Sequence, residues 1–469
     1  MSLQLQYLSL FVTFICFETF VFLLHPLQLS GFFMVISSDN SVFTSLQQDG
    51  PLAVSDSVFI CQPYSQRTKK WVKNLRSRKV NVTKYRALRS QIFEFLGVNS
   101  FEEIAELLTQ PQLQKERKIR AYALLGNMFG IIGTTQEIEA RVHDYAQTAD
   151  AVINSLKTKI LAPYTSHIAI TNEIEVANNP IELLLIIFND RYHRKARFEA
   201  RRKLVLMGLA GSIDQREKET ETEDKFSHFL HFLNDYVWSP NQKIGEHDIV
   251  YLLSQHSPED FSCEKVDILS YKEAKQVVTG NGVKKTLLKR RRFNTGTKDI
   301  PIYVSIRKKL PEAKVLKLLR KNAKNPATAV DDELGLMAVL DSAADIKVFQ
   351  QHLTHSASKA NSLMVLEDIS DTLTGKTTYQ SQSIGSSNKT PMLKFFARLG
   401  GMRVEFIIHT NTSWLNYMYQ QDVAHDEYEV KRIFDSGVIE LLFPKEIFHL
   451  NHTSIRNDMI NLFRKQIEK

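Results

Sequence analysis

Acidic and basic residues interrupt several apolar segments in the C-terminal half of the chain. Glu405 lies in the middle of the apolar segment MRVEFIIHT, and Asp331 and Asp332 directly precede a second one, LGLMAVLD. Carboxylates on neighbouring strands hold Mg²⁺ against nucleotide phosphates, because Mg²⁺ completes its shell with water and phosphate oxygens. A basic run over 284–309 supplies cations for such phosphates. The alternative is that these are unrelated strand, cap and surface residues.

A β-hairpin is predicted around Gly400-Gly401, because two glycines between apolar runs are typical of a two-residue turn. The turn fixes the register and gives the hairpin one apolar face and one mixed face. The mixed face is interpreted as the floor of an active site centred on Glu405, or else as a face exposed to water. The apolar pairs are Leu399 with Met402, Ala397 with Val404, Phe395 with Phe406 and Leu393 with Ile408, and the mixed pairs are Arg398 with Arg403, Phe396 with Glu405, Lys394 with Ile407 and Met392 with His409.

Composition is that of an ordinary globular protein. Of the 469 residues, 43% are hydrophobic and 24% charged, and the net charge of +8 favours anionic partners such as nucleotides or RNA. The three cysteines, Cys16, Cys61 and Cys263, are far apart, so neither a zinc site nor a disulfide framework is expected. This cysteine usage indicates a reducing compartment, and we expect a cytoplasmic protein.

An apolar segment over residues 7–24 is long enough to cross a bilayer. It contains Glu18 and lacks the basic region of a secretory signal. Three interpretations stay open: a membrane anchor, an atypical signal, or a gene-model extension upstream of a true start at Met34. Residues 1–33 are therefore left out of the prediction of the fold.

The first half of the chain is predicted to be a mainly helical domain over 34–265. Apolar residues recur at three- and four-residue spacing over 91–209, and VDILSYKEAKQVV (266–278) is read as the last helix of this half. The basic block 67–89 holds ten Lys or Arg and no acid. It is interpreted either as a solvated helix face or as a contact for RNA or DNA.

The second half is predicted to alternate strands and helices, which makes the chain an α+β protein. A strand over 334–341, a helix over 342–355 and a strand over 362–370 precede the hairpin. One long helix over 412–434 follows it, and the chain ends in a helical tail over 436–469.

The order of these segments over about 275–435 resembles the synthetase domain of the RelA/SpoT family, whose members are nucleotidyltransferases that make guanosine tetraphosphate in the stringent response. Four short motifs carry the resemblance. They are SIRKK (305–309), DELGLMAVLDS (332–342), TYQS (378–381), and VEFIIHT (404–410) with VAHDEYEVK (423–431).

The resemblance implies a helical half followed by a nucleotidyltransferase-like mixed β-sheet flanked by helices. It also implies a set of site residues. These are Ser305 and Lys309 for ATP, with Lys298 and Arg292 as further candidates; Asp332 and Glu405 for Mg²⁺; Tyr379, Gln380, Ser381 and His409 for the acceptor; and Glu405 as the group that acts on the acceptor hydroxyl.

The sequence departs from the family pattern at several positions. Met337 stands where the family usually has an arginine that contacts ATP, Thr377-Thr378 replaces Asn-Gly, and Ser383 replaces a histidine. The expected activity is Mg²⁺-dependent transfer of pyrophosphate from ATP to the 3′-hydroxyl of GDP or GTP. The alternatives are the 3′ end of tRNA as the acceptor, as in toxic relatives, and an inactive nucleotide-binding regulator.

Overall fold

A computed structural model describes residues 79–189, 191–240, 247–280, 282–323, 325–330, 334–373 and 390–468. The chain forms two compact units, which we call the helical unit (Met1–Arg216, Pro311–Pro326 and Glu440–Leu450) and the sheet unit (Glu217–Leu310, Ala327–Ile439 and Asn451–Lys469). The predictions for residues 7–24, for Asp332 and for Tyr379, Gln380 and Ser381 lie outside the described residues.

The helical unit confirms the helices predicted from apolar spacing. Side chains cap the N-termini of two of these helices. Thr134 and Glu137 form a capping box, and the Ser100 hydroxyl accepts a hydrogen bond from the Glu103 amide. The helices are α6 (Lys79–Leu96), α7 (Phe101–Leu107), α8 (Pro111–Phe129), α9 (Thr135–Ser155), α10 (Asn172–Val176), α11 (Pro180–Phe188), α12 (Arg194–Glu219, up to Arg216), α15 (Pro311–Lys321), the end of α20 (Val438–Leu442) and α21 (Lys445–Phe448).

The sheet unit is built on one eight-stranded mixed sheet with the order β2-β1-β3-β4-β5-β8-β7-β6. Its neighbouring strands are antiparallel except for β5 and β8, which are parallel. The fold-class prediction is therefore confirmed at the level of a helical part followed by a mixed sheet flanked by helices. The strands are β1 (Asp248–His256), β2 (Cys263–Ser270), β3 (Val283–Asn294), β4 (Asp299–Lys308), β5 (Leu334–Leu340), β6 (Val365–Asp371), β7 (Leu393–Leu399) and β8 (Met402–Thr410).

The predicted hairpin is β7 and β8, and seven of its eight predicted pairs are present, from Leu399 with Met402 to Leu393 with Ile408. The pair of Met392 with His409 is absent because β7 begins at Leu393. Gly400 and Gly401 both have positive φ, as the turn requires.

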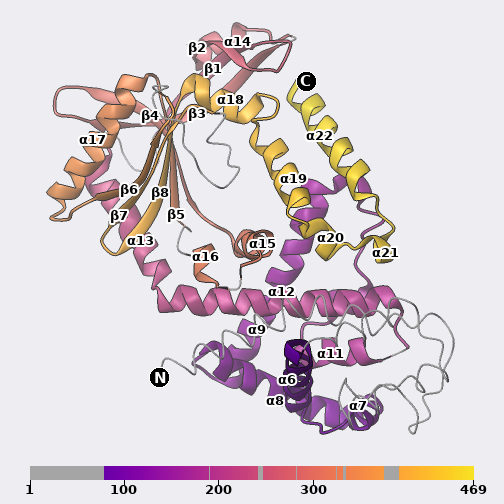
Figure 1. Cartoon of the computed structure of the whole chain (residues 1–469). Helices are drawn as coiled ribbons and strands as arrows, with labels where there is room; N and C mark the ends of the chain where they lie inside the picture. The colour runs from indigo at the N-terminus through magenta and orange to yellow at the C-terminus, as the bar shows by residue number, and fades with distance from the viewer. Residues whose placement is uncertain are drawn as a thin grey trace. The chain divides into compact units, whose positions relative to one another are not determined.

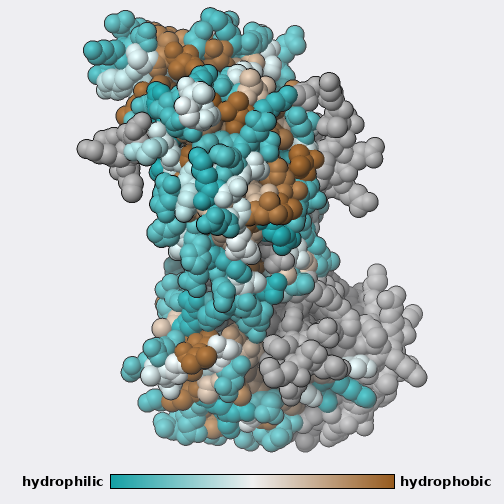
Figure 2. Space-filling model, turned by 90° about the vertical axis from the view of Figure 1, so that its left-hand side faces the viewer, coloured by the Kyte–Doolittle hydropathy of each residue, from teal (hydrophilic) through white to brown (hydrophobic). Residues whose placement is uncertain are grey.

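Helices cover the apolar face of the sheet (Figure 1). Phe406 of β8 stacks on Phe395 of β7 at 5.0 Å and meets Phe229 edge-on at 6.2 Å. The helices that cover this face are α13 (Thr222–Phe232) and α17 (Ala343–Lys359). Helix α13 continues as a π-helical turn over Leu233–Val237. The side of the molecule that carries α17 is mostly hydrophilic with separate hydrophobic patches (Figure 2), as expected for a helix with one buried face.

Two secondary-structure predictions for the segment before residue 279 are wrong. The segment 266–278 is the end of β2 followed by the short helix α14 (Tyr271–Gln276), and β1 also lies before residue 265 in a part predicted to be helical. The continuous apolar run of β1 fits a helix as well as a strand, so its pairing with β2 and β3 decides the outcome.

The predicted helix over 412–434 is two helices, α18 (Asn411–Tyr419) and α19 (His425–Asp435). The break has no glycine or proline to announce it. Asp260, in the turn after β1, accepts hydrogen bonds from the Gln421 amide at 2.8 Å and from the Gln420 side chain at 2.8 Å. These tertiary contacts stabilise the extended backbone of Gln420.

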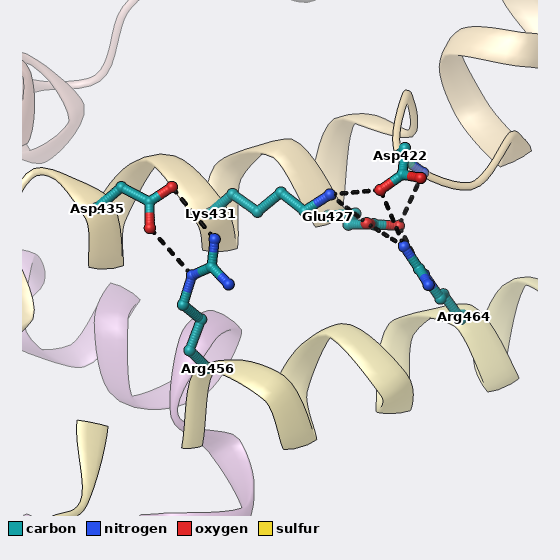
Figure 3. Close-up of polar contacts among 6 residues, drawn as sticks. All are labelled: Asp422, Glu427, Lys431, Asp435, Arg456 and Arg464. Carbon is teal, nitrogen blue, oxygen red and sulfur yellow. Dashed lines mark hydrogen bonds and ion pairs between the residues drawn. The ribbon is translucent and has the colours of Figure 1, made fainter. Parts of the chain in front are cut away.

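The last helix of the chain, α22 (His452–Glu468), is bound to α19 by ion pairs (Figure 3). Glu427 is completely buried, and its carboxylate accepts from Arg464 at 2.7 Å and lies 2.6 Å from the Lys431 ammonium. Burial alone raises the pKa of Glu427, but the hydrogen bonds from Arg464 and Lys431 outweigh burial and lower the pKa below 4.5. A second pair, Arg456 with Asp435, is more exposed.

None of the helices in the described part of the chain combines the length and apolar character that crossing a membrane requires. The remaining helix of the sheet unit, α16 (Ala327–Val330), is a single turn.

We predict that Glu427→Gln lowers the free energy of unfolding at pH 7 by about 2 kcal/mol or more, because Arg464 and Lys431 lose their buried counter-charge. Because folding lowers the pKa of Glu427, its stabilisation is full above pH 4.5 and is lost as the pH falls through the folded-state pKa. Urea unfolding of wild type and variant should therefore converge in acid.

The matched control is Asp435→Asn, which removes the exposed partner of Arg456 and should change stability by less than about 1 kcal/mol. Equal losses for the two variants at pH 7 would contradict the assignment of the stabilising role to Glu427.

Candidate functional site

The face of the sheet opposite α17 carries polar side chains on its central strands. Residues that pair across neighbouring strands point to the same side of a sheet. One row runs from Arg307 on β4 through Gly335 on β5 and Glu405 on β8 to Phe396 on β7. The next row toward α18 is Ser305, Met337, Ile407 and Lys394. We call these two rows the polar face.

Gly335 lets Arg307 reach a strand that is not its neighbour. A Cβ atom at Gly335 would lie 2.9 Å from Nε of Arg307 and 3.3 Å from its Cγ, closer than such atoms normally approach. With no side chain there, the Arg307 guanidinium passes over β5 and donates from Nη2 to Oε2 of Glu405 at 2.9 Å. A side chain at position 335 would therefore force the Arg307 side chain to shift from this path over β5.

Glu405 is buried, with only 9% of its surface exposed, and both carboxylate oxygens contact cations. Oε2 accepts from Arg307, and Oε1 lies 2.9 Å from the ammonium of Lys394. Burial alone raises the pKa of this carboxyl group, but Lys394, Arg307 and Lys309 outweigh burial and hold the pKa below its ordinary value. Glu405 is thus ionised at neutral pH, and the cations beside it are the groups that attract an anion.

The structure brings Ser305, Lys309 and Glu405 to the same part of the sheet. Ser305 shares a face with Arg307 and lies two residues before it in β4. Lys309 directly follows β4 and is close enough to lower the pKa of Glu405. The SIRKK segment therefore lies on the strand whose Arg307 contacts Glu405, and the role of Ser305 and Lys309 in binding ATP stays a prediction.

Arg292 and Lys298 lie far from Glu405. Arg292 pairs across the strands with Pro301 and donates to Asp248 at 2.7 Å. Lys298 precedes β4, is mostly exposed and lies 3.9 Å from Asp345. At about 3.3 Å per residue, six residues of β4 separate the Arg292 pair from Arg307 by roughly 20 Å. Both residues therefore lie too far from Arg307 to contact the same bound phosphate group.

His409 is completely buried and has no exposed surface to offer an acceptor nucleotide. Its Nδ1 is 2.7 Å from the hydroxyl of Ser413, at the start of α18. Burial lowers the pKa of His409 to about 4, so the ring is neutral at pH 7. The geometry gives His409 a structural place between β8 and α18, where its ring also lies 5.6 Å from that of Tyr417.

Aromatic groups of α18 and α19 border the polar face. The rings of Tyr417 and His425 are 5.4 Å apart, and the charge of Arg307 lowers the pKa of each. For both groups the larger effect is burial, which raises the pKa of Tyr417 and lowers that of His425. His425 belongs to the AHDEY segment, so the structure places this motif near Arg307.

The described residues of the polar face do not fit a Mg²⁺ site by themselves. Glu405 contributes one carboxylate, and both of its oxygens are engaged by cations. A search of the part of the chain that the structure describes finds no group of three or more His, Cys, Asp or Glu side chains placed to hold a metal ion. The expected second ligand, Asp332, lies outside the described residues.

Three residues of the site were not among those expected from the sequence: Arg307, Lys394 and Gly335. The register predicted for the hairpin already placed Lys394 on the face of Glu405, so its role was accessible. Arg307 was inside the SIRKK motif, but only the pairing of β4 with β5 shows that it points toward Glu405.

Comparison with known proteins gives no relative from which a function could be transferred: no family model, no curated protein and no solved structure matches the chain.

We predict that Arg307→Met and Lys394→Met each raise the pKa of Glu405, because burial is then opposed by fewer cations. With the folded-state pKa raised, the stabilisation from an ionised Glu405 is smaller at pH 7 and is lost at a higher pH during acid titration. Carboxyl NMR of the labelled glutamates, together with acid unfolding, measures both effects. Lys298→Met is the control and should shift neither.

We also predict that Gly335→Ala reproduces the effect of Arg307→Met, because the added Cβ displaces the guanidinium from Glu405. Gly280→Ala is the control, since its Cβ would have no heavy atom within 4 Å. If the Glu405 pKa is unchanged in Gly335→Ala, the route of Arg307 over β5 is refuted.

Proposed function

We propose that the chain transfers the pyrophosphoryl group of ATP to the 3′-hydroxyl of GDP or GTP. The observation that carries the proposal is the buried, ionised Glu405 on a central strand, with Arg307 and Lys394 on its two oxygens. The sequence supports it: Asp332 comes three residues before Gly335, which pairs with Glu405, and the TYQS segment lies between β6 and β7.

The cations of the polar face suit the phosphates of the donor. An incoming polyphosphate competes with Glu405 for Arg307 and Lys394, since both cations form stronger, charge-assisted hydrogen bonds with phosphate oxygens than with water. Ser305 adds a hydroxyl donor on the same face. Binding of the donor therefore releases the Glu405 carboxylate from part of its ion pairing.

The released carboxylate then orients the acceptor hydroxyl and takes its proton. The 3′-oxygen forms a bond with the β-phosphorus of ATP, the bond from that phosphorus to the α–β bridging oxygen breaks, and AMP leaves with that oxygen. In the protein without substrates the cations keep the pKa of Glu405 below its ordinary value, so the carboxylate starts as a weak base, and positioning of the two substrates has to supply most of the rate.

A second candidate is a regulator that binds a nucleotide without turnover. It is favoured by Met337, which pairs with Ser305 on the polar face, at the position where the resembling family has an arginine that contacts ATP. The low pKa of Glu405 favours the same candidate, because it weakens the base.

The test uses purified full chain, ATP labelled at the γ-phosphate, MgCl₂, and GDP, GTP or tRNA as acceptors in parallel. Wild type is expected to label a guanine nucleotide, and Glu405→Gln to lower the rate about 100-fold or more while ATP still binds. Glu264→Gln, an exposed glutamate on β2, is the matched control and should keep wild-type activity.

The outcomes separate the candidates. ATP binding that depends on Arg307 without transfer to any acceptor supports the regulator and refutes the enzyme. If only tRNA is labelled, the acceptor is the 3′ end of tRNA and not a guanine nucleotide. If the Glu405→Gln variant still transfers the label at the wild-type rate, Glu405 is not needed for the reaction.

A further inference from the structure

A row of arginines follows one face of α12 in the helical unit. Arg194, Arg197 and Arg201 are spaced at i, i+3 and i+7, which places them on the same side of a helix. Their exposure falls along the row: Arg194 is exposed, Arg197 half-buried and Arg201 only 5% exposed. The row therefore leads from solvent to a cation in the interior.

The buried end of the row has no counter-charge. Within the described part of the chain, Nε and Nη1 of Arg201 have no hydrogen-bond partner. Burial, followed by the like charges of Arg197 and Arg194, lowers the pKa of Arg201 to about 9, so the group is still protonated at pH 7. The guanidinium lies over the ring of Phe198 at 5.8 Å, but no carboxylate compensates its charge. A buried charge without a counter-charge is strongly unfavourable, and buried polar groups in folded proteins are almost always satisfied.

The next two residues of α12 are also buried cations, and both have partners. Arg202, 2% exposed, donates to the Leu442 carbonyl at 2.7 Å and lies over the ring of Phe443 at 5.0 Å. Lys203 donates to Asp150 at 2.9 Å and to the Ile174 carbonyl at 3.0 Å. Arg201 thus differs from its neighbours in partners, while burial is similar for all three.

We propose that Arg201 binds a phosphate group of a small molecule, which reaches it along Arg197 and Arg194. A guanidinium complements phosphate in charge and can donate two parallel hydrogen bonds to its oxygens, so one bound phosphate supplies the counter-charge that Arg201 lacks. The site lies in the helical unit and is separate from the residues of the polar face, so it stands whether or not the proposed transfer reaction occurs.

The first experiment measures the melting temperature of the full chain with orthophosphate or pyrophosphate, against sodium chloride at equal ionic strength. We expect phosphate to raise the wild-type Tm by about 5 °C at saturating concentration. Arg201→Met, combined with Arg307→Met so that the polar face does not contribute, should abolish this rise. Arg201→Met should not lower the Tm in sodium chloride, because the substitution removes an uncompensated buried charge and keeps a similar shape.

The neighbouring Arg202→Met is the matched control. It should lower the Tm, because Arg202 has partners, and should keep the rise with phosphate. Arg307→Met, on the polar face, should also keep that rise. Calorimetric titration of Arg201→Lys, which retains the charge but not the planar fork, should show a Kd for pyrophosphate about tenfold higher than wild type.

The proposal would be overturned by no rise with phosphate in wild type, by a rise that persists in the double variant Arg201→Met/Arg307→Met, or by a rise lost in Arg307→Met alone. Destabilisation by Arg201→Met as large as that by Arg202→Met would equally assign Arg201 a structural role. If pyrophosphate binds more tightly than orthophosphate, the source is a polyphosphate compound; if not, it is a monophosphate.

Discussion

The ion pair between Arg307 and Glu405 is the interaction on which the polar face depends. A carboxylate inside a sheet is stable only if cations compensate its loss of water. Around Glu405 on β8, strand β5 contributes Gly335, strand β4 contributes Arg307, and strand β7 contributes Lys394. The same cations that stabilise the buried carboxylate are the ones proposed to bind phosphate, so in this proposal stability and ligand binding use one set of charges.

Local features of the structure followed from the sequence, because they depend on neighbouring residues. The β7–β8 hairpin follows from Gly400-Gly401 and from alternating side chains, and its register placed Lys394 and Glu405 on one face. Most helices of the helical unit follow in the same way from apolar spacing and caps.

What could not be predicted depends on contacts between distant segments. The route of Arg307 over Gly335 requires the parallel pairing of β5 with β8, and the break between α18 and α19 requires Asp260. That Arg201 lacks a counter-charge is visible only once burial is known, since RKARFEARRK (194–203) is typical of an ordinary charged helix surface. The four short motifs show in which order the candidate site residues occur along the chain, but only the pairing of the strands shows which of them lie together.

The order of strands has a consequence for synthesis of the protein. β8 is the last strand to be made, yet it lies inside the sheet, between β5 and β7. Until it emerges from the ribosome, the apolar strand LGLMAVL has an open edge, and unpaired apolar edges promote aggregation. The nascent chain therefore passes through a stage in which the edge of β5 is exposed, before β8 inserts between β5 and β7 and closes the sheet.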